Sequence, residues 1–153
     1  MANTYTQLYI QMVFAVKGRE HLIPKEYKED VHRYITGVIQ QRKHKLLAIH
    51  CMPDHAHVFI GYHPTQTLRD LVSEIKTAST KYIKKQPWMP FDFSWQVGYS
   101  AFSYSRSHID KVVKYILNQE EHHKKRTFKE EYLDMLQKFD IDYNEQYVFE
   151  FYD

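Results

Sequence analysis

The sequence contains few of the residues that mark fibrous, disordered or disulfide-linked proteins. Its 153 residues include one cysteine, four glycines and five prolines. The single Cys51 excludes an internal disulfide, and the low glycine and proline content excludes a collagen-like or low-complexity chain. No apolar run approaches the roughly 20 residues that span a bilayer, and residues 1–7 lack the charged and apolar regions of a signal peptide. We therefore expect one cytoplasmic globular domain over residues 1–153, with no membrane contact.

Charge is distributed unevenly along the chain. Residues 130–153 carry eight acidic side chains and one basic side chain, a net charge of −7, whereas the whole chain has a net charge of +2. Residues 1–129 therefore carry +9, which indicates a basic body with a polyanionic partner and an acidic C-terminal tail from about residue 130. A solvated surface with an acidic cap is the other interpretation of the same pattern.

Hydrophobic periodicity predicts an α+β chain. Strands are expected over residues 7–16, 45–52 and 55–61, with one or two more over 91–102 and a bend at Gly98. Helices are expected over residues 24–43 and from the capping signals at Thr67, Ser107 and Thr127. The order β-α-β-β-α-β followed by helices predicts a ferredoxin-like split βαβ fold, an antiparallel sheet with helices on one face, the other face available, and extra C-terminal helices.

The third strand contains His55 and His57, which are two residues apart. Side chains with this spacing share a face of a strand, so both imidazoles can reach one metal ion. Residues 56, 58 and 60 then point into the core, and the two histidines are expected on the solvent-facing side. A His-x-His triplet by itself is also compatible with a purely structural role.

The helix that begins near Ser107 places Tyr115 and Gln119 four residues apart, so they are neighbours on one helical face. His108, Lys111 and His122 are expected in the same sector, beside an apolar stripe. A half-buried tyrosine next to a solvated amide would give the same spacing.

In this order and on these elements, the two signals together resemble the single-tyrosine HUH transposases of the insertion-sequence 200/605 type. The segments that carry the resemblance are PDHAHVFI (residues 53–60) and YILNQ (residues 115–119). It extends to WQVGYSAFS (residues 95–103) and the N-terminal strand, and so covers nearly the whole chain. The middle residue of the HUH triplet is Ala56, at the small end of the hydrophobic range.

The resemblance implies that His55, His57 and Gln119 bind a divalent metal and that Tyr115 is the nucleophile. It also implies an endonuclease that leaves a 5′-phosphotyrosine and a free 3′-hydroxyl on single-stranded DNA. The expected assembly is a homodimer that recognises DNA hairpins. Its active site is either contained in one subunit or shared, with the tyrosine helix from one subunit and the histidines from the other.

The expected chemistry is consistent with these residue types. A metal held by neutral ligands can polarise a phosphodiester, and a phenol with a pKa near 10 needs help to lose its proton. Imidazole ligands favour zinc, nickel or manganese, whereas the resemblance favours magnesium or manganese. Asp54 is either a turn residue or a partner that orients an imidazole, and His50 is expected to be structural.

Basic side chains near aromatic residues are the candidates for DNA contact, because they can neutralise phosphates while unpaired bases stack on aromatic rings. The candidates are Arg42, Lys43, Lys45, Lys81, Lys84, Lys85, Lys124, Lys125 and Arg126.

Three other functions remain open from the sequence. A nucleic-acid-binding module of ferredoxin-like fold would bind RNA on its open sheet face without a metal or Tyr115. A metal-dependent hydrolase would use the same histidines with water as the nucleophile. A domesticated relative would keep the family chemistry but serve host DNA processing.

Overall fold

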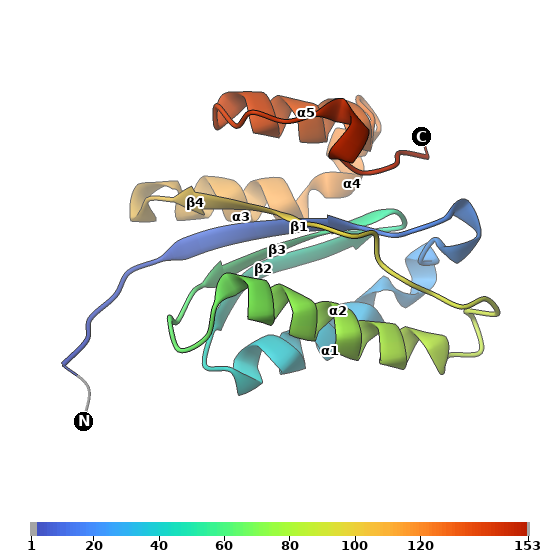
Figure 1. The fold of residues 1–153 in the computed structure, drawn as a ribbon, viewed down its shortest axis with the longest axis horizontal. Coiled ribbons are helices and arrows are strands. Elements are labelled where there is room, and N and C mark those ends of the chain that lie inside the picture. The colour runs from blue at the N-terminus through green and yellow to red at the C-terminus, as the bar shows by residue number, and fades with distance from the viewer. Residues whose placement is uncertain (1–2, 153) are drawn as a thin grey trace.

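The computed structural model describes residues 3–152, which form a four-stranded sheet with helices on both faces (Figure 1). The elements in chain order are β1 (Tyr9–Ala15), α1 (Lys28–Gln41), β2 (Lys45–Met52), β3 (His55–Gly61), α2 (Leu68–Lys84), β4 (Ser100–Tyr104), α3 (Ile109–Leu117), α4 (Gln119–His123) and α5 (Phe128–Lys138). Short 3₁₀ turns occupy Arg19–His21, Lys25–Tyr27, Arg106–His108 and Glu145–Tyr147. No helix within residues 3–152 has the length and apolar character to cross a membrane.

The strand order β2-β3-β1-β4, with antiparallel pairing between all neighbours, confirms the ferredoxin-like split βαβ fold. Local sequence signals account for much of it. Strand β2 ends just before Pro53 and strand β3 begins just after Asp54, as these turn residues predict. Thr67 caps α2 by accepting a hydrogen bond from the Asp70 amide at 3.1 Å, and Thr127 and Glu130 form a complete capping box on α5.

Alternation along β3 separates two sets of side chains. Ala56, Val58 and Ile60 are fully buried in the core beneath α1 and α2. His55, His57 and Phe59 point to the opposite face, where Phe59 packs against α3. The histidine pair therefore lies on the face of the sheet that the C-terminal helices cover.

The expectation that this second face is available was wrong. The apolar residues Val112 and Ile116 of α3 pack on Phe59 and Ala48, and Phe128 and other residues of α5 form a second cluster with β1 and β4. In Figure 1, α3, α4 and α5 lie on the side of the sheet opposite α1 and α2. The sheet face is covered because amphipathic C-terminal helices bury their own apolar stripes on it.

Two further segments differ from the sequence-based expectation. The third helix ends at Leu117, because Asn118 leaves helical geometry with φ −102° and ψ 22° before α4 begins. Residues 91–102 contribute only the start of β4 and an isolated bridge between Val16 and Trp95, with Gly98 bent at φ +91° as predicted.

The acidic C-terminal segment is packed against the body of the protein within residues 130–152. The Gly18 amide donates to the Tyr152 hydroxyl at 2.7 Å, and the Glu150 amide donates to the Gln96 side chain at 2.7 Å. Phe149 is buried beside α5. This packing brings one acidic residue of the segment, Glu131, into the interior.

Candidate metal centre and nucleophile

The His55 and His57 side chains are fully buried, and their rings lie 5.1 Å apart between centroids. The expected solvent-facing orientation was therefore wrong, although the shared strand face was correctly predicted. The His55 ring stacks on Phe128 of α5 at 3.7 Å between centroids, which closes the site from the outside.

Each imidazole is oriented through its Nδ1 atom. The Nδ1 of His55 lies 2.7 Å from a carboxylate oxygen of Asp54, and the Nδ1 of His57 lies 2.7 Å from the amide oxygen of Gln11. With Nδ1 donating to these oxygens, both Nε2 atoms carry the lone pair that binds a metal. Of the two roles open for Asp54, the structure therefore supports that of an orienting partner.

Glu131 supplies a carboxylate that the sequence analysis missed. It is fully buried, and its Oε1 lies 3.2 Å from the Nε2 of His57 and 3.6 Å from the Nε2 of His55. A signal for it was present in the sequence: Phe128, Glu131, Tyr132 and Met135 have the spacing of one helical face, and Glu131 is the one acid among apolar residues. The position of Glu131 was not recognised because residues 130–153 were interpreted together as an acidic tail.

Gln119 approaches the same centre from the start of α4. Its side chain is fully buried, with Oε1 at 3.4 Å from the Nε2 of His55 and Nε2 donating to Glu131 at 3.0 Å. His123, one helical turn further on, places its Nε2 3.1 Å from the amide oxygen of Gln119 and 3.3 Å from Glu131. The amide oxygen of Gln119 is thus turned towards the imidazole nitrogens.

Tyr115 completes the cluster from α3. Its hydroxyl donates a hydrogen bond to Oε2 of Glu131, and its ring lies 6.2 Å from that of His57 between centroids. Burial, followed by the charge of Glu131, raises the pKa of Tyr115 above the ordinary tyrosine value. The phenol is therefore held neutral beside a carboxylate.

The electrostatics of the cluster favour a carboxylate among neutral imidazoles. Burial by itself would raise the pKa of Glu131, but the imidazoles of His123 and His57, which lie within hydrogen-bonding distance of the carboxylate, hold its pKa below the usual range. Burial lowers the pKa of His57, so this imidazole resists protonation. One anion surrounded by neutral nitrogen and oxygen donors is a cation-binding arrangement.

The distances fit a metal ion. The nearest ligand atoms of His55, His57 and Glu131 all lie within 4.8 Å of one another. Neighbouring ligands on an ion with bonds of about 2.1 Å stand about 3.0–3.4 Å apart in octahedral or tetrahedral geometry. The separations of 3.2, 3.4 and 3.6 Å in this cluster are close to that range, so the donor set suits a divalent cation.

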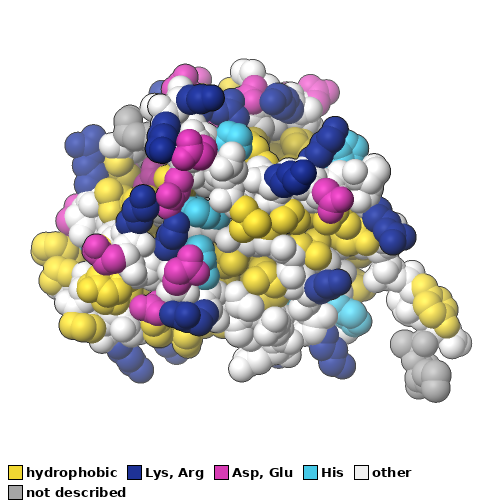
Figure 2. All heavy atoms as spheres, turned by 180° about the vertical axis from the view of Figure 1, so that it is seen from behind, with side chains coloured by type: hydrophobic (Ala, Val, Ile, Leu, Met, Phe, Trp, Pro, Cys, Tyr) yellow, Lys and Arg dark blue, Asp and Glu magenta, His cyan; other side chains and the backbone are white. Residues whose placement is uncertain are grey.

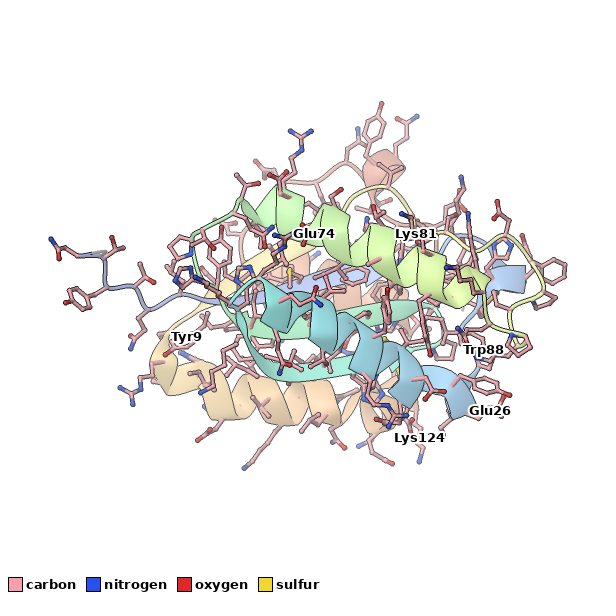
Figure 3. All side chains as sticks on the ribbon, turned by 90° about the horizontal axis from the view of Figure 1, so that it is seen from below. Tyr9, Glu26, Glu74, Lys81, Trp88 and Lys124 are labelled. Carbon is pink, nitrogen blue, oxygen red and sulfur yellow. The ribbon has the colours of Figure 1, made fainter. Side chains whose placement is uncertain are left out.

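The basic candidates for DNA contact do not form one group. Arg126 reaches the site, where its hydrogen bond to Tyr115 offsets a part of the rise in the pKa of that tyrosine. Arg42, Lys43 and residues 81–85 belong to the α1–α2 layer on the other face of the sheet, where Arg42 pairs with Glu74 at 2.7 Å. Lys45 is the first residue of the edge strand β2. In the view of Figure 3, Lys81 is labelled on α2, whereas Lys124 is labelled on the side of α1 away from α2. In Figure 2, basic side chains are spread over the surface among acidic ones and border hydrophobic side chains.

Comparison with known proteins gives consistent matches. A family model described as "Transposase IS200 like" matches residues 4–119. The ISDra2 transposase TnpA of Deinococcus radiodurans is 23% identical over 120 residues, which cover 74% of this chain and 84% of that protein.

Two solved structures share the fold. A Deinococcus radiodurans R1 protein described as a transposase has a TM-score of 0.57 at 23% identity, over 78% of this chain and 95% of that one. The REP-associated tyrosine transposase, bound to a REP hairpin, has a TM-score of 0.59 at 15% identity, over 80% of this chain and 73% of that one. Glu131 and α5 lie beyond the residues that the family model matches.

Proposed function

The chain belongs to the IS200-like transposase family, and we propose that it cuts and rejoins single-stranded DNA with Tyr115 as the nucleophile. The observation that carries this proposal is a continuous contact within one chain: the Tyr115 hydroxyl bonds to Glu131, and Glu131 contacts His57. The nucleophile thus contacts a carboxylate, and the carboxylate contacts a candidate metal ligand.

The metal would be held by His55, His57 and Glu131, with the amide oxygen of Gln119 as a further ligand. When bound, a divalent cation supplies Lewis acidity that polarises the scissile phosphodiester. Two imidazoles together with carboxylate and amide oxygens suit manganese or magnesium, the ions that we expect to be used. This adds Glu131 to the ligand set expected from the sequence.

The protein's own part in the reaction is nucleophilic. The phenol oxygen of Tyr115 attacks the phosphorus, a Tyr–O–P bond forms, and the bond from phosphorus to the 3′ oxygen breaks. The 3′ oxygen leaves with a proton, which balances the one lost by the phenol. The resulting 5′-phosphotyrosine conserves the phosphodiester energy, so a 3′-hydroxyl can later attack it and regenerate both tyrosine and a joined strand.

Glu131 is placed to assist this step. Its Oε2 accepts the hydrogen bond of the Tyr115 hydroxyl, which holds the phenol next to the candidate metal ligands. The same bond fixes the direction of the phenol oxygen. Arg126, beside the phenol, is positioned to bind a phosphate oxygen.

The complete cluster lies within one chain, which supports an active site that does not borrow its tyrosine helix from a second subunit. We expect a DNA hairpin at the end of the recognised strand, and the hairpin-bound REP-associated transposase of the same fold supports this. A homodimer remains part of the proposal as an assembly of two complete sites.

The test is a denaturation-resistant adduct between the protein and single-stranded DNA from the flanks of its own gene, formed with Mn²⁺ or Mg²⁺. Tyr115→Phe should abolish the adduct, whereas Tyr147→Phe should not, because Tyr147 is 81% exposed and lies outside the cluster. Cleavage by the wild type without any adduct would instead support a hydrolase that uses water.

A further inference from the structure

A cavity of about 320 Å³ opens beside the nucleophile, between β4, α3 and α5. Its walls are largely aromatic and aliphatic, and the residues that matter most are Tyr104 from β4, Tyr115 from α3, and Met135 and Phe139 at the end of α5. The size falls within the roughly 300–1,000 Å³ of pockets that hold small organic groups.

The floor of the cavity is connected to the candidate metal centre through Gln11. This residue is 1% exposed, and its Oε1 lies 2.7 Å from the Nδ1 of His57. Its Nε2 donates to the hydroxyl of Tyr104 at 2.8 Å. Burial raises the pKa of Tyr104 to about 12, so this hydroxyl stays protonated at neutral pH. A group in the cavity is therefore one hydrogen-bonded residue away from His57.

The mouth of the cavity is basic. Lys111, Arg126 and Lys138 line it together with a single acid, Asp134. Asp134 pairs with Arg126 at 3.3 Å and with Lys138 at 3.0 Å, so the fixed charges still leave an excess of positive charge. A ligand with an aromatic body and a negatively charged backbone matches this combination.

We propose that this cavity receives one unpaired nucleotide of the DNA strand, next to the bond that Tyr115 attacks. The base lies against the Tyr104 and Phe139 rings, whose centroids are 5.4 Å apart at an interplanar angle of 85°. Its flanking phosphates meet Lys111 and Arg126. This inference rests on the proposed function and adds to it the binding site for the nucleotide that positions the scissile phosphate.

Binding is tested first without chemistry. An oligothymidylate that contains 5-iodouracil is irradiated with the full-length protein in EDTA, and crosslinked peptides are mapped by mass spectrometry. Crosslinks at Tyr104 or Phe139 are expected, because this base reacts with the aromatic rings that it contacts. Crosslinks confined to α1 or α2 would overturn the proposal.

Matched variants supply a second measurement, fluorescence anisotropy with labelled oligothymidylate. Phe139→Ala should raise the Kd about fivefold or more through lost stacking, whereas Phe91→Ala, also partly exposed but outside the cavity, should not. Lys111→Ala should reduce the slope of log affinity against log salt by about 0.7, and Lys114→Ala on the same helix should change it less.

The outcomes separate this site from the chemistry. Unchanged affinity for both cavity variants, or a change in oligomeric state on sedimentation with no change in DNA affinity, would overturn the nucleotide site. The two lysine variants are expected to fold normally, because Lys111 and Lys114 are both exposed, so a change in their salt dependence reports on DNA binding. Failure of the transposase chemistry would show separately, as a missing metal-dependent adduct that this assay does not measure.

Discussion

The Tyr115 hydroxyl donates a hydrogen bond to the Glu131 carboxylate, although the two residues lie 16 positions apart on different helices. The other carboxylate oxygen lies 3.2 Å from His57. One buried side chain of α5 therefore joins the nucleophile to the candidate metal centre. Its charge attracts a cation and at the same time raises the pKa of the tyrosine.

Glu131→Gln should weaken Mn²⁺ binding by at least about tenfold, because the amide keeps the shape but removes the one anion of the donor set. Isothermal titration calorimetry of the full-length protein measures this directly. Glu121→Gln is the matched control, since Glu121 is exposed on α4, where it pairs with Lys124. Equal affinity in the wild type and both variants would remove Glu131 from the ligand set.

His55→Ala should lower the free energy of unfolding by about 1–3 kcal/mol in the absence of metal. The reason is that the imidazole is fully buried and stacked on Phe128, so truncation leaves a void. Urea denaturation is the measurement, with His63→Ala as the exposed control. Equal stability of the two variants would contradict a packing role for the His55 ring. In the same variant, Mn²⁺ should no longer raise the melting temperature.

Acid should destabilise the protein partly through His50. Burial, followed by the charge of Lys28, lowers the pKa of His50 from 6.5 to about 4 in the folded state. A depressed folded-state pKa means that its stabilising contribution is complete above pH 6.5 and is lost as the pH falls towards 4. His50→Phe should therefore lose less stability than the wild type between these two pH values, measured by urea denaturation in EDTA. An identical pH dependence would rule out this contribution.

Local sequence signals were enough for most of the fold. The β2–β3 hairpin, the caps at Thr67 and Thr127, and the bend at Gly98 depend on residues adjacent in sequence, and each was predicted. The shared face of the His pair also follows from one strand, whereas Tyr115 and Gln119 were expected on one helix and lie on α3 and α4, on either side of Asn118. The contacts that tertiary packing creates between distant elements were not predicted.

Glu131 illustrates this limit. Its burial depends on α5 folding back over the sheet, and nothing in residues 128–138 alone specifies that surface. The same packing explains why His55 and His57 are buried when strand alternation placed them towards solvent. The acidic composition of residues 130–153 suggested a solvated tail, whereas one of those acids is at the centre of the site.

Binding to single-stranded DNA should depend on salt if the basic side chains neutralise phosphates. Log affinity is expected to fall with log salt by about 0.7 for each phosphate neutralised. Arg126→Ala should reduce this slope more than Arg42→Ala, because Arg126 lies at the site and Arg42 is paired with Glu74 on the other face. Anisotropy titrations over a series of salt concentrations measure both slopes, and equal slopes would contradict this placement of the DNA.

If Tyr115 is the nucleophile, it is the residue that becomes covalently attached to DNA. The wild-type protein is incubated with Mn²⁺ and single-stranded DNA from the flanks of its gene, then digested with nuclease and trypsin and analysed by mass spectrometry. We expect a nucleotide mass on the peptide of residues 115–124, located at Tyr115. A nucleotide on a peptide that contains Tyr104 or Tyr132 instead, or cleaved DNA with no modified peptide, would contradict it.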